Sequence, residues 1–294
     1  MPNITKTPPI LRKDYYTSCM HGLDDIGWEY GFAVTSYGTR IGARTSDPEL
    51  LEHLQARIPF GSEPSDTEIV DRLFSVLTIR KKKPKPNRYN LYWDHMLFGK
   101  ELKLAEMLDS FDAITSLSIA ELSDEQLFIH AGVVEWQGKA ILIPGRSHSG
   151  KTTLVAELVK LGATYYSDEF AIIDEEGYVS AYPKPLAIRR PGQQKQSDIS
   201  AEELGGKSGN LKLPVGLIIA CQYKKGASWK PEAMTPGNSL LYLLDNTHSA
   251  LRAPERAIRV LKELSLNATT ISSSRGEANK VAQLILDNTE KRRR

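Results

Sequence analysis

One stretch of this 294-residue sequence combines glycines, a lysine and a hydroxyl residue at a spacing that suits phosphate chemistry. Residues 145–152 read Gly-Arg-Ser-His-Ser-Gly-Lys-Thr, which fits G-x-x-x-x-G-K-[ST] at every fixed position. An apolar run over 140–143 precedes this loop, and a sequence with helical character follows it. Glycines let the backbone curl so that N–H groups point inward, and the start of the helix adds positive potential. The pattern therefore predicts a site for a nucleoside triphosphate.

The residues of the loop have distinct expected roles. Lys151 supplies a mobile positive charge for the β- and γ-phosphates, and the Thr152 hydroxyl is placed to ligate Mg²⁺. We therefore expect ATP and Mg²⁺ as cofactors. The residues expected to bind the nucleotide are Gly145, Arg146, Ser147, His148, Ser149, Gly150, Lys151, Thr152 and Thr153.

Two adjacent acids, Asp168 and Glu169, follow the helical stretch and directly precede a strand-like run. One carboxylate can hold Mg²⁺, and the other can accept the proton of an attacking hydroxyl. The sequence leaves open which acid does which. Asp174 is a rival ligand for Mg²⁺, although Asp-Glu-Glu-Gly is more typical of a turn. The expected metal ligands are Thr152, Asp168 and Glu169.

Several motifs of other nucleotide-binding classes do not occur in the sequence. It contains no Asn-Lys-x-Asp, which reads guanine, and no Leu-Ser-Gly-Gly-Gln stretch of the transporter ATPases. No long hydrophobic run ends in Asp-Glu as in the motor ATPases. These absences disfavour a GTPase switch, a transporter ATPase and a motor.

The composition is that of an ordinary globular protein, with 40% hydrophobic and 25% charged residues. The net charge of +2 argues against nucleic acid as the main partner. No apolar run reaches the ~18 residues of a membrane span, and the N-terminus lacks the apolar core of a secretory signal. Cys19 and Cys221 lie far apart, so we expect neither a disulfide framework nor a zinc site. We expect a cytoplasmic protein without a membrane partner.

The pattern of apolar residues predicts two domains: an N-terminal α+β region over 1–125, which would face the substrate or partner, and a nucleotide-binding domain over 126–294. In the first region we expect a hairpin over 31–45, strands over 70–79 and 87–96, and helices over 48–57 and 99–121. In the second we expect strands over 128–136, 139–143, 170–173, 178–182, 215–221 and 268–272, and helices over 151–162, 238–245, 254–265 and 276–290.

Two polar segments separate these elements. Residues 189–212 are glycine-rich and predict a mobile loop that covers the site, with one short helix after Asp198 or Ser200. Arg189 or Arg190, at the start of this loop, could supply positive charge to a transition state. The basic run 80–88 predicts a solvated loop between strands, with contact to an acidic partner or a phosphate as the alternative.

Residues 128–190 resemble the P-loop kinase domain of HPr kinase/phosphorylase and its relatives. The resemblance is carried by His130-Ala131-Gly132, the hairpin over 133–143, the loop 145–152 and Ser167-Asp168-Glu169. It implies an α/β fold with a P-loop kinase domain of the HPr-kinase/phosphoenolpyruvate-carboxykinase-like type and a smaller N-terminal α+β domain. Residues 182–189 are also similar to the Pro-x-Pro-Leu segment of a looser HPr-kinase-like subgroup that is associated with peptide modification.

The resemblance implies roles for individual residues. Asp168 matches the carboxylate assigned as proton acceptor, and Glu169 matches the second acid, with Glu in place of Asp. Lys151 and Thr152 match the phosphate and metal residues, and His130 matches an active-site histidine. The expected catalytic set is Asp168, Lys151, His130 and Arg189. The Gly-Leu-Gly-rich segment that follows the acids in HPr kinases is missing, which argues against HPr as the substrate and against phosphorylase activity.

Together, these features predict an ATP- and Mg²⁺-dependent kinase that transfers the γ-phosphate to a hydroxyl, with a serine of a peptide or protein as the expected acceptor. Two other hypotheses stay open: a nucleotide-binding regulatory or assembly protein with little turnover, and a kinase for a small metabolite. Relatives of HPr kinase form oligomers, so a homo-oligomer is a further expectation.

Overall fold

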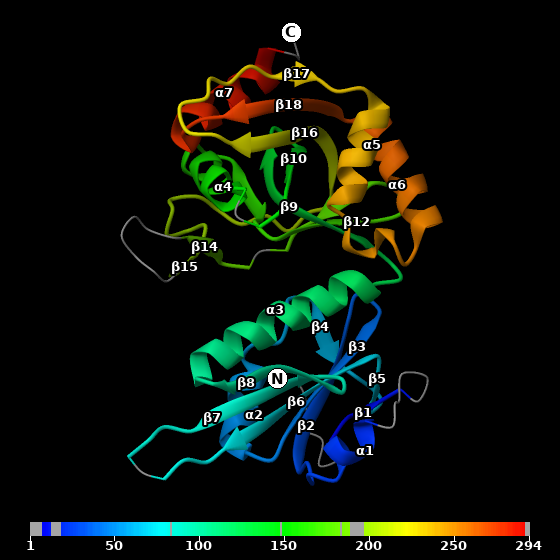
Figure 1. Cartoon of the computed structure of the whole chain (residues 1–294). Helices are drawn as coiled ribbons and strands as arrows, with labels where there is room; N and C mark the ends of the chain where they lie inside the picture. Colours follow the sequence, from blue (N-terminus) through cyan, green and yellow to red (C-terminus); the bar gives the residue numbers. More distant parts are fainter. Residues whose placement is uncertain are drawn as a thin grey trace. The chain divides into compact units, whose positions relative to one another are not determined.

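The chain divides into two compact units, Met1–Asp124 and Glu125–Arg294. The structure is a computed structural model that describes residues 8–12, 19–82, 84–147, 149–182, 184–188 and 197–291. Both units mix helices with strands, and the strands form several separate sheets (Figure 1). The architecture is therefore mixed α/β.

The first unit is built on a six-stranded sheet with the strand order β4-β2-β3-β6-β7-β8. Its strands are β2 (Tyr30–Ser36), β3 (Thr39–Thr45), β4 (Ser62–Pro64), β6 (Arg72–Ile79), β7 (Arg88–Trp93) and β8 (Met96–Leu102). A separate parallel pair consists of β1 (Ile10–Leu11) and β5 (Ile69–Val70). The helices are α1 (Cys19–Asp24), α2 (Pro48–Gln55) and α3 (Leu104–Leu122).

Several elements that the sequence predicts for this unit are present, and local residues explain why they form. Tyr37 and Gly38 join β2 to β3 with φ angles of 49° and 78°, a two-residue hairpin turn that favours glycine. Asp47 caps α2 because its carboxylate accepts a hydrogen bond from the backbone of Glu49. In the core, the rings of Phe74 and Phe111 meet edge to face at 5.6 Å. The hairpin, the helix and the loop between β6 and β7 are confirmed.

One expectation for this unit is wrong. The helix expected from residue 99 begins at Leu104, and the residues before it form β8, which pairs with β7. Asp94, with a φ of 52°, turns the chain between the two strands. The segment Met96–Leu102 begins with three apolar residues and continues with charged ones, which suits an exposed edge strand, whereas the helical spacing starts only after this segment.

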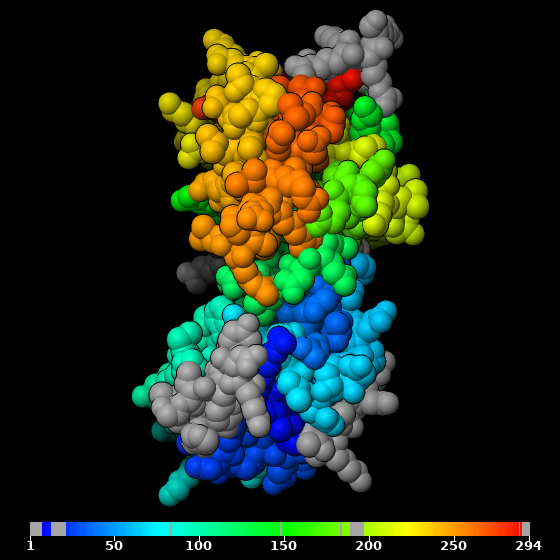
Figure 2. All heavy atoms as spheres, turned by 90° about the vertical axis from the view of Figure 1, so that its right-hand side faces the viewer, coloured from blue at the N-terminus to red at the C-terminus, as the bar shows by residue number. Residues whose placement is uncertain are grey.

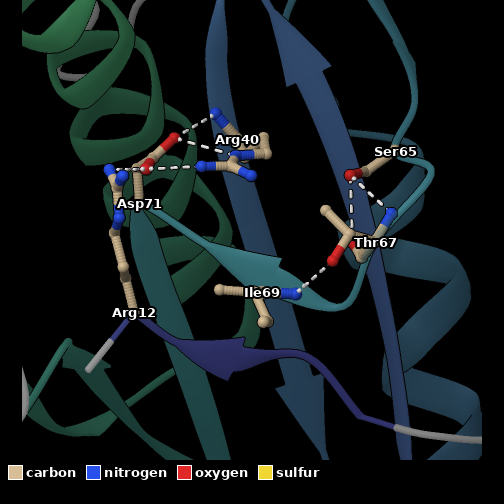
Figure 3. A network of polar contacts seen from close by, with 6 residues as sticks. All are labelled: Arg12, Arg40, Ser65, Thr67, Ile69 and Asp71. Carbon is tan, nitrogen blue, oxygen red and sulfur yellow. Dashed lines mark hydrogen bonds and ion pairs between the residues drawn. The ribbon is translucent and has the colours of Figure 1, made fainter.

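Polar contacts fasten β1 and β3 to the start of β6 (Figure 3). The Asp71 carboxylate accepts hydrogen bonds from the backbone and guanidinium of Arg40 at 3.0 to 3.3 Å and from Arg12 at 3.1 Å. Burial acts to raise the pKa of Asp71, but the hydrogen bonds and charge of Arg40 outweigh it and lower the pKa. Beside this network, the Thr67 hydroxyl accepts a hydrogen bond from the backbone of Ile69 at 3.2 Å.

The second unit contains an eight-stranded sheet in which β10 lies between an antiparallel and a parallel neighbour. The strand order is β10-β9-β12-β13-β16-β18-β17, β11 pairs with β9, and β10 also pairs with β16. The strands are β9 (Leu127–Trp136), β10 (Lys139–Pro144), β11 (Thr164–Ser167), β12 (Phe170–Ile173), β13 (Tyr178–Ser180), β16 (Leu213–Tyr223), β17 (Glu232–Ala233) and β18 (Thr269–Arg275). Because β10 pairs with both β9 and β16, five of these strands close into a ring.

Helices pack on both faces of this sheet. They are α4 (Lys151–Lys160), α5 (Pro236–Asp245), α6 (Pro254–Asn267), α7 (Ala278–Lys291) and the 3₁₀ turn η2 (His248–Ala250). Strand β10 alternates between two cores: Ile141 and Ile143 pack with α4 and α7, whereas Leu142 packs with α5 and α6. Figure 2 shows α5 and α6, in gold and orange, side by side on one face of this unit.

The expected strands and helices of the second unit are present. Strands β11 and β17 were not expected, and the prediction of a short helix after Asp198 or Ser200 is wrong. In its place, β15 (Ser197–Ile199) pairs with β14 (Leu186–Ile188) and a turn follows. Residues 189–196 lie outside the described residues. The described part of the expected mobile loop is fastened to β11, because Tyr165 exchanges backbone hydrogen bonds of 2.8 Å with Lys207 and Gly209.

Candidate active site

The glycine-rich loop joins β10 to α4, as the sequence pattern predicts. The Gly145 backbone donates a hydrogen bond of 3.0 Å to the His130 carbonyl, which ties the start of the loop to β9. Gly150 caps α4 with a φ of 85°, a left-handed conformation that side-chain-bearing residues rarely adopt. A helix that starts here directs its free N–H groups toward the loop, which is the arrangement that binds phosphate.

The Lys151 ammonium lies inside the loop and has no carboxylate partner in hydrogen-bond contact among the described residues. Its Nζ donates to the carbonyls of Gly145 at 2.6 Å and Arg146 at 3.0 Å, and the residue is 7% exposed. Burial lowers its pKa to about 8, against the opposing charges of Asp168 and Glu169. A phosphate group at this position would restore the electrostatic stabilisation that burial removes.

A buried hydroxyl marks the centre of the loop. The Ser149 Oγ has no hydrogen-bond partner in the part of the chain that the structure describes. A Cβ on Gly145 would lie 2.9 Å from this oxygen, so only glycine fits there without a shift. Buried polar atoms are rarely left unsatisfied in folded proteins, so this hydroxyl is suited to a polar ligand.

Asp168 lies beside the start of α4, although it comes from the turn after β11. The Tyr165 hydroxyl donates a hydrogen bond of 3.2 Å to its carboxylate, and the Thr152 side chain lies close enough to act on the same carboxylate. Burial raises the pKa of Asp168, and the Thr152 and Tyr165 side chains oppose the rise. The contact between Thr152 and Asp168 brings the expected metal hydroxyl and one expected acid together.

The second acid has a different environment. The Glu169 carboxylate forms an ion pair with Lys184 at 3.2 Å, and the Glu169 backbone N–H donates a hydrogen bond to the Ser167 hydroxyl. The rival acid, Asp174, accepts hydrogen bonds from the Tyr178 backbone at 2.8 Å and from Lys212 at 2.9 Å. Asp174 is therefore a turn residue, as the alternative interpretation of its sequence predicted.

The donor set at Thr152, Asp168 and Glu169 fits Mg²⁺. It offers one hydroxyl and two carboxylates, and Mg²⁺ prefers such oxygen ligands while taking the remaining positions from phosphates and water. Among the described residues there is no cluster of three His, Cys, Asp or Glu side chains that could hold a metal without such help.

His130 lies on β9 within an aromatic cluster. Its ring centroid is 6.4 Å from that of Phe170 and 5.9 Å from that of His248. Burial and the positive charge of Lys151 lower the pKa of His130 to about 4, so the imidazole is neutral at pH 7. A neutral histidine can donate one hydrogen bond and accept another, but it brings no charge to the site.

A cavity of about 660 Å³ opens beside the first half of the loop. Gly145, Arg146 and Ser149 form one wall. The rest of the lining comes from the ends of β16, β18 and α5 and from the segment around β17, and it is Ala220, Cys221, Gln222, Lys230, Glu232, Met234, Tyr242, Asp245, Asn246, Ser272, Ser273 and Ser274. Cavities of this volume hold small molecules, and this one lies at the carboxyl ends of parallel strands, where α/β proteins bind ligands.

The structure thus gathers Lys151, Thr152, Asp168, Glu169 and His130 within one unit. Three residues of the expected binding set are exposed: Ser147, Thr153 and Arg146, which pairs with Asp245 at 3.1 Å on the surface. His148 and Arg189 lie outside the described residues, so their expected roles stay predictions.

Three residues near the site were not expected from the sequence. Tyr165 orients Asp168, Lys184 pairs with Glu169, and His248 packs against Phe170 with ring centroids 5.5 Å apart. The tyrosine could have been found as the inward position of a short strand before the acids. Nothing in the local sequence marks His248, because tertiary packing of η2 brings it to β12.

Within the described residues, no helix is long and apolar enough to cross a membrane.

No protein-family model matches this chain, and no curated protein does. Among solved structures, the chain is similar to the Hpr(Ser) kinase/phosphatase from Coxiella burnetii, with 14% sequence identity and a TM-score of 0.35. The similarity covers 57% of this chain and 99% of that chain. At this level of similarity, function has to be inferred from the chemistry of the site.

Proposed function

We propose that this protein is an ATP- and Mg²⁺-dependent kinase with a P-loop domain of the HPr-kinase-like type, and that it transfers the γ-phosphate to the hydroxyl of a serine in a peptide or protein. The observation that carries the proposal is the position of Asp168 beside the start of α4, where its charge acts on the Lys151 ammonium and its carboxylate interacts with the Thr152 side chain. It places a carboxylate next to the loop whose lysine and N–H groups suit a triphosphate.

In the proposed reaction, the backbone N–H groups of the loop bind the phosphates and Lys151 neutralises the terminal one. Thr152 and Glu169 would hold Mg²⁺, which would offset the negative charge on the β- and γ-phosphates. Asp168 accepts the proton of the acceptor hydroxyl while the new P–O bond forms and the bond between the γ-phosphorus and ADP breaks. Tyr165 and Thr152 hold the carboxylate in place for this transfer.

Asp168 suits the role of base better than Glu169. Its raised pKa makes it a stronger proton acceptor than an ordinary aspartate, whereas Lys184 already neutralises Glu169. The cavity beside Gly145 and Arg146 supports a two-substrate reaction, because it leaves space next to the loop beyond that needed for phosphates.

A transfer assay with γ-labelled ATP, screened against peptides encoded beside the gene, tests the function. Asp168→Asn should lower the transfer rate at least 100-fold and leave the Kd of MgATP within a few-fold. Asp174→Asn is the matched control, because it removes a buried, hydrogen-bonded acid from the same unit, and it should transfer phosphate at the wild-type rate. Equal rates for Asp168→Asn and wild type would exclude Asp168 as the base.

A further inference from the structure

Arg275 is the last residue of β18, and its guanidinium contacts the glycine-rich loop at Gly150. Its Nη2 donates a hydrogen bond of 2.7 Å to the Gly150 carbonyl, and its Nη1 donates at 3.1 Å to the Gly276 carbonyl. The guanidinium carbon lies 5.5 Å from the centre of the Tyr223 ring. A Cβ on Gly150 would lie 2.3 Å from Nη2, so the arginine fills the space that a side chain there would need.

The charge of Arg275 has no carboxylate counter-charge within ion-pair distance among the described residues. The residue is 2% exposed, and its Nε has no hydrogen-bond partner there. Its neighbour Cys221 interacts with the guanidinium, which acts to lower the pKa of the thiol, but burial outweighs this and raises the pKa, so Cys221 carries no compensating charge. Glu277 hydrogen bonds to the Tyr223 hydroxyl instead. A buried cation without a counter-charge is uncommon, since its desolvation is not offset.

The first unit contains a comparable buried arginine, Arg44, whose charge is neutralised by a carboxylate of the same unit. Arg44 is 4% exposed and lies 5.0 Å from the centre of the Trp28 ring. Its Nη2 is 2.6 Å from the Asp24 carboxylate, so its charge is neutralised within the chain. The two arginines share burial and an aromatic neighbour, and they differ in the counter-charge.

The position of Arg275 indicates which kind of ligand would neutralise its charge. The guanidinium contacts Gly150, the N-cap of α4, where the helix dipole is already positive and a further cation is unfavourable. Two positive features at one place favour an anion, and the same loop holds the Lys151 ammonium and the unpartnered Ser149 hydroxyl.

We propose that Arg275 is a positioning residue of the phosphate site, which fixes Gly150 in its left-handed conformation and whose charge is compensated only when a polyphosphate occupies the loop. This inference rests on the proposed function, because it takes the ligand to be a nucleotide. The sequence predicted that Arg189 could supply positive charge to the site. The inference assigns part of that charge to Arg275, which lies far from the motif in the sequence.

The test compares Arg275→Met and Arg275→Lys with wild type and with Arg44→Met, in the full chain. Calorimetry gives the Kd of MgADP and MgATP, and thermal unfolding gives the Tm with and without nucleotide. Arg275→Met should weaken MgATP binding about 10- to 100-fold, because it removes one charge from a buried charge-pairing site. Its nucleotide-free Tm should equal or exceed that of wild type, because the uncompensated charge is gone. Arg275→Lys keeps the charge and should lose less affinity.

Arg44→Met should behave in the opposite way, with a lower nucleotide-free Tm and a wild-type Kd. The inference fails if Arg275→Met binds MgATP as wild type does. It also fails if Arg275→Met lowers the nucleotide-free Tm as much as Arg44→Met does, since that would show an ordinary structural arginine. If wild type itself binds neither nucleotide, the proposed function fails with it.

Discussion

The depressed pKa of Lys151 predicts that nucleotide binding takes up a proton. The pKa is about 8 in the free protein, where burial removes the ammonium from water. A bound triphosphate favours the charged ammonium, so the pKa in the complex should return to its ordinary value or above. The charged form binds the ligand, so affinity is fully present below pH 8 and is lost as the pH rises through 8.

The size of the effect follows from these pKa values. In the free protein, Lys151 is protonated in about nine molecules of ten at pH 7 and in about one of ten at pH 9. Binding of MgATP should therefore take up about 0.1 proton at pH 7 and about 0.9 proton at pH 9, and the Kd should rise about tenfold between the two.

Calorimetry at pH 9 in buffers with different ionisation enthalpies measures the number of protons directly. Lys151→Arg is the control, because arginine does not titrate in this range and should show no uptake. A proton uptake near zero for the wild type at pH 9 would refute the buried, ligand-paired lysine, and so would equal uptake by Lys151→Arg.

Three further predictions concern stability. The pKa of His130 is about 4 in the folded protein and has its ordinary value in the unfolded chain, so the unfolded state binds more protons and acid lowers the free energy of unfolding. Denaturant unfolding at pH 7 and pH 5 should show that the wild type loses at most about 2 kcal/mol more of this free energy than His130→Asn does. Equal losses in the two proteins would contradict the prediction. Phe74→Ala should cost about 3 to 5 kcal/mol by urea unfolding, because it empties a fully buried ring position, whereas Met96→Ala at an exposed edge should cost under about 0.5. Asp245→Asn should change stability by less than about 1 kcal/mol, because its ion pair is exposed; a larger loss in thermal unfolding would show an unrecognised role.

The sequence predicted the site best where the chemical role of a residue and the local backbone geometry both require the same residue type. The glycine-rich loop could be predicted because each residue type has a local reason: Gly150 needs a left-handed backbone, and Lys151 needs to reach back over the loop. The strand before it and the helix after it follow from periodicity. The adjacency of Asp168 to Thr152 could be expected only as a consequence of that strand–loop–helix frame.

Contacts between distant segments could not be predicted in this way. Arg275 reaches Gly150 only because β18 is placed two strands from β10, and a lone arginine before a glycine has no sequence signal. Polar, glycine-rich composition indicated a mobile loop after residue 189. In the structure, Gly206 and Gly209 instead allow the backbone to approach Val159 and Tyr166, where any Cβ would clash.

One tyrosine connects that polar segment to the chemistry. Tyr165 uses its backbone to hold residues 207 and 209, and its hydroxyl touches both Asp168 and the Lys184 carbonyl. The residues tolerated at 207–209 are therefore constrained by Asp168, roughly forty positions earlier in the chain. Substitutions of Gly206 or Gly209 would displace the Tyr165 ring and so change the position of the Asp168 carboxylate. They would alter the reaction rate without changing any residue of the glycine-rich loop.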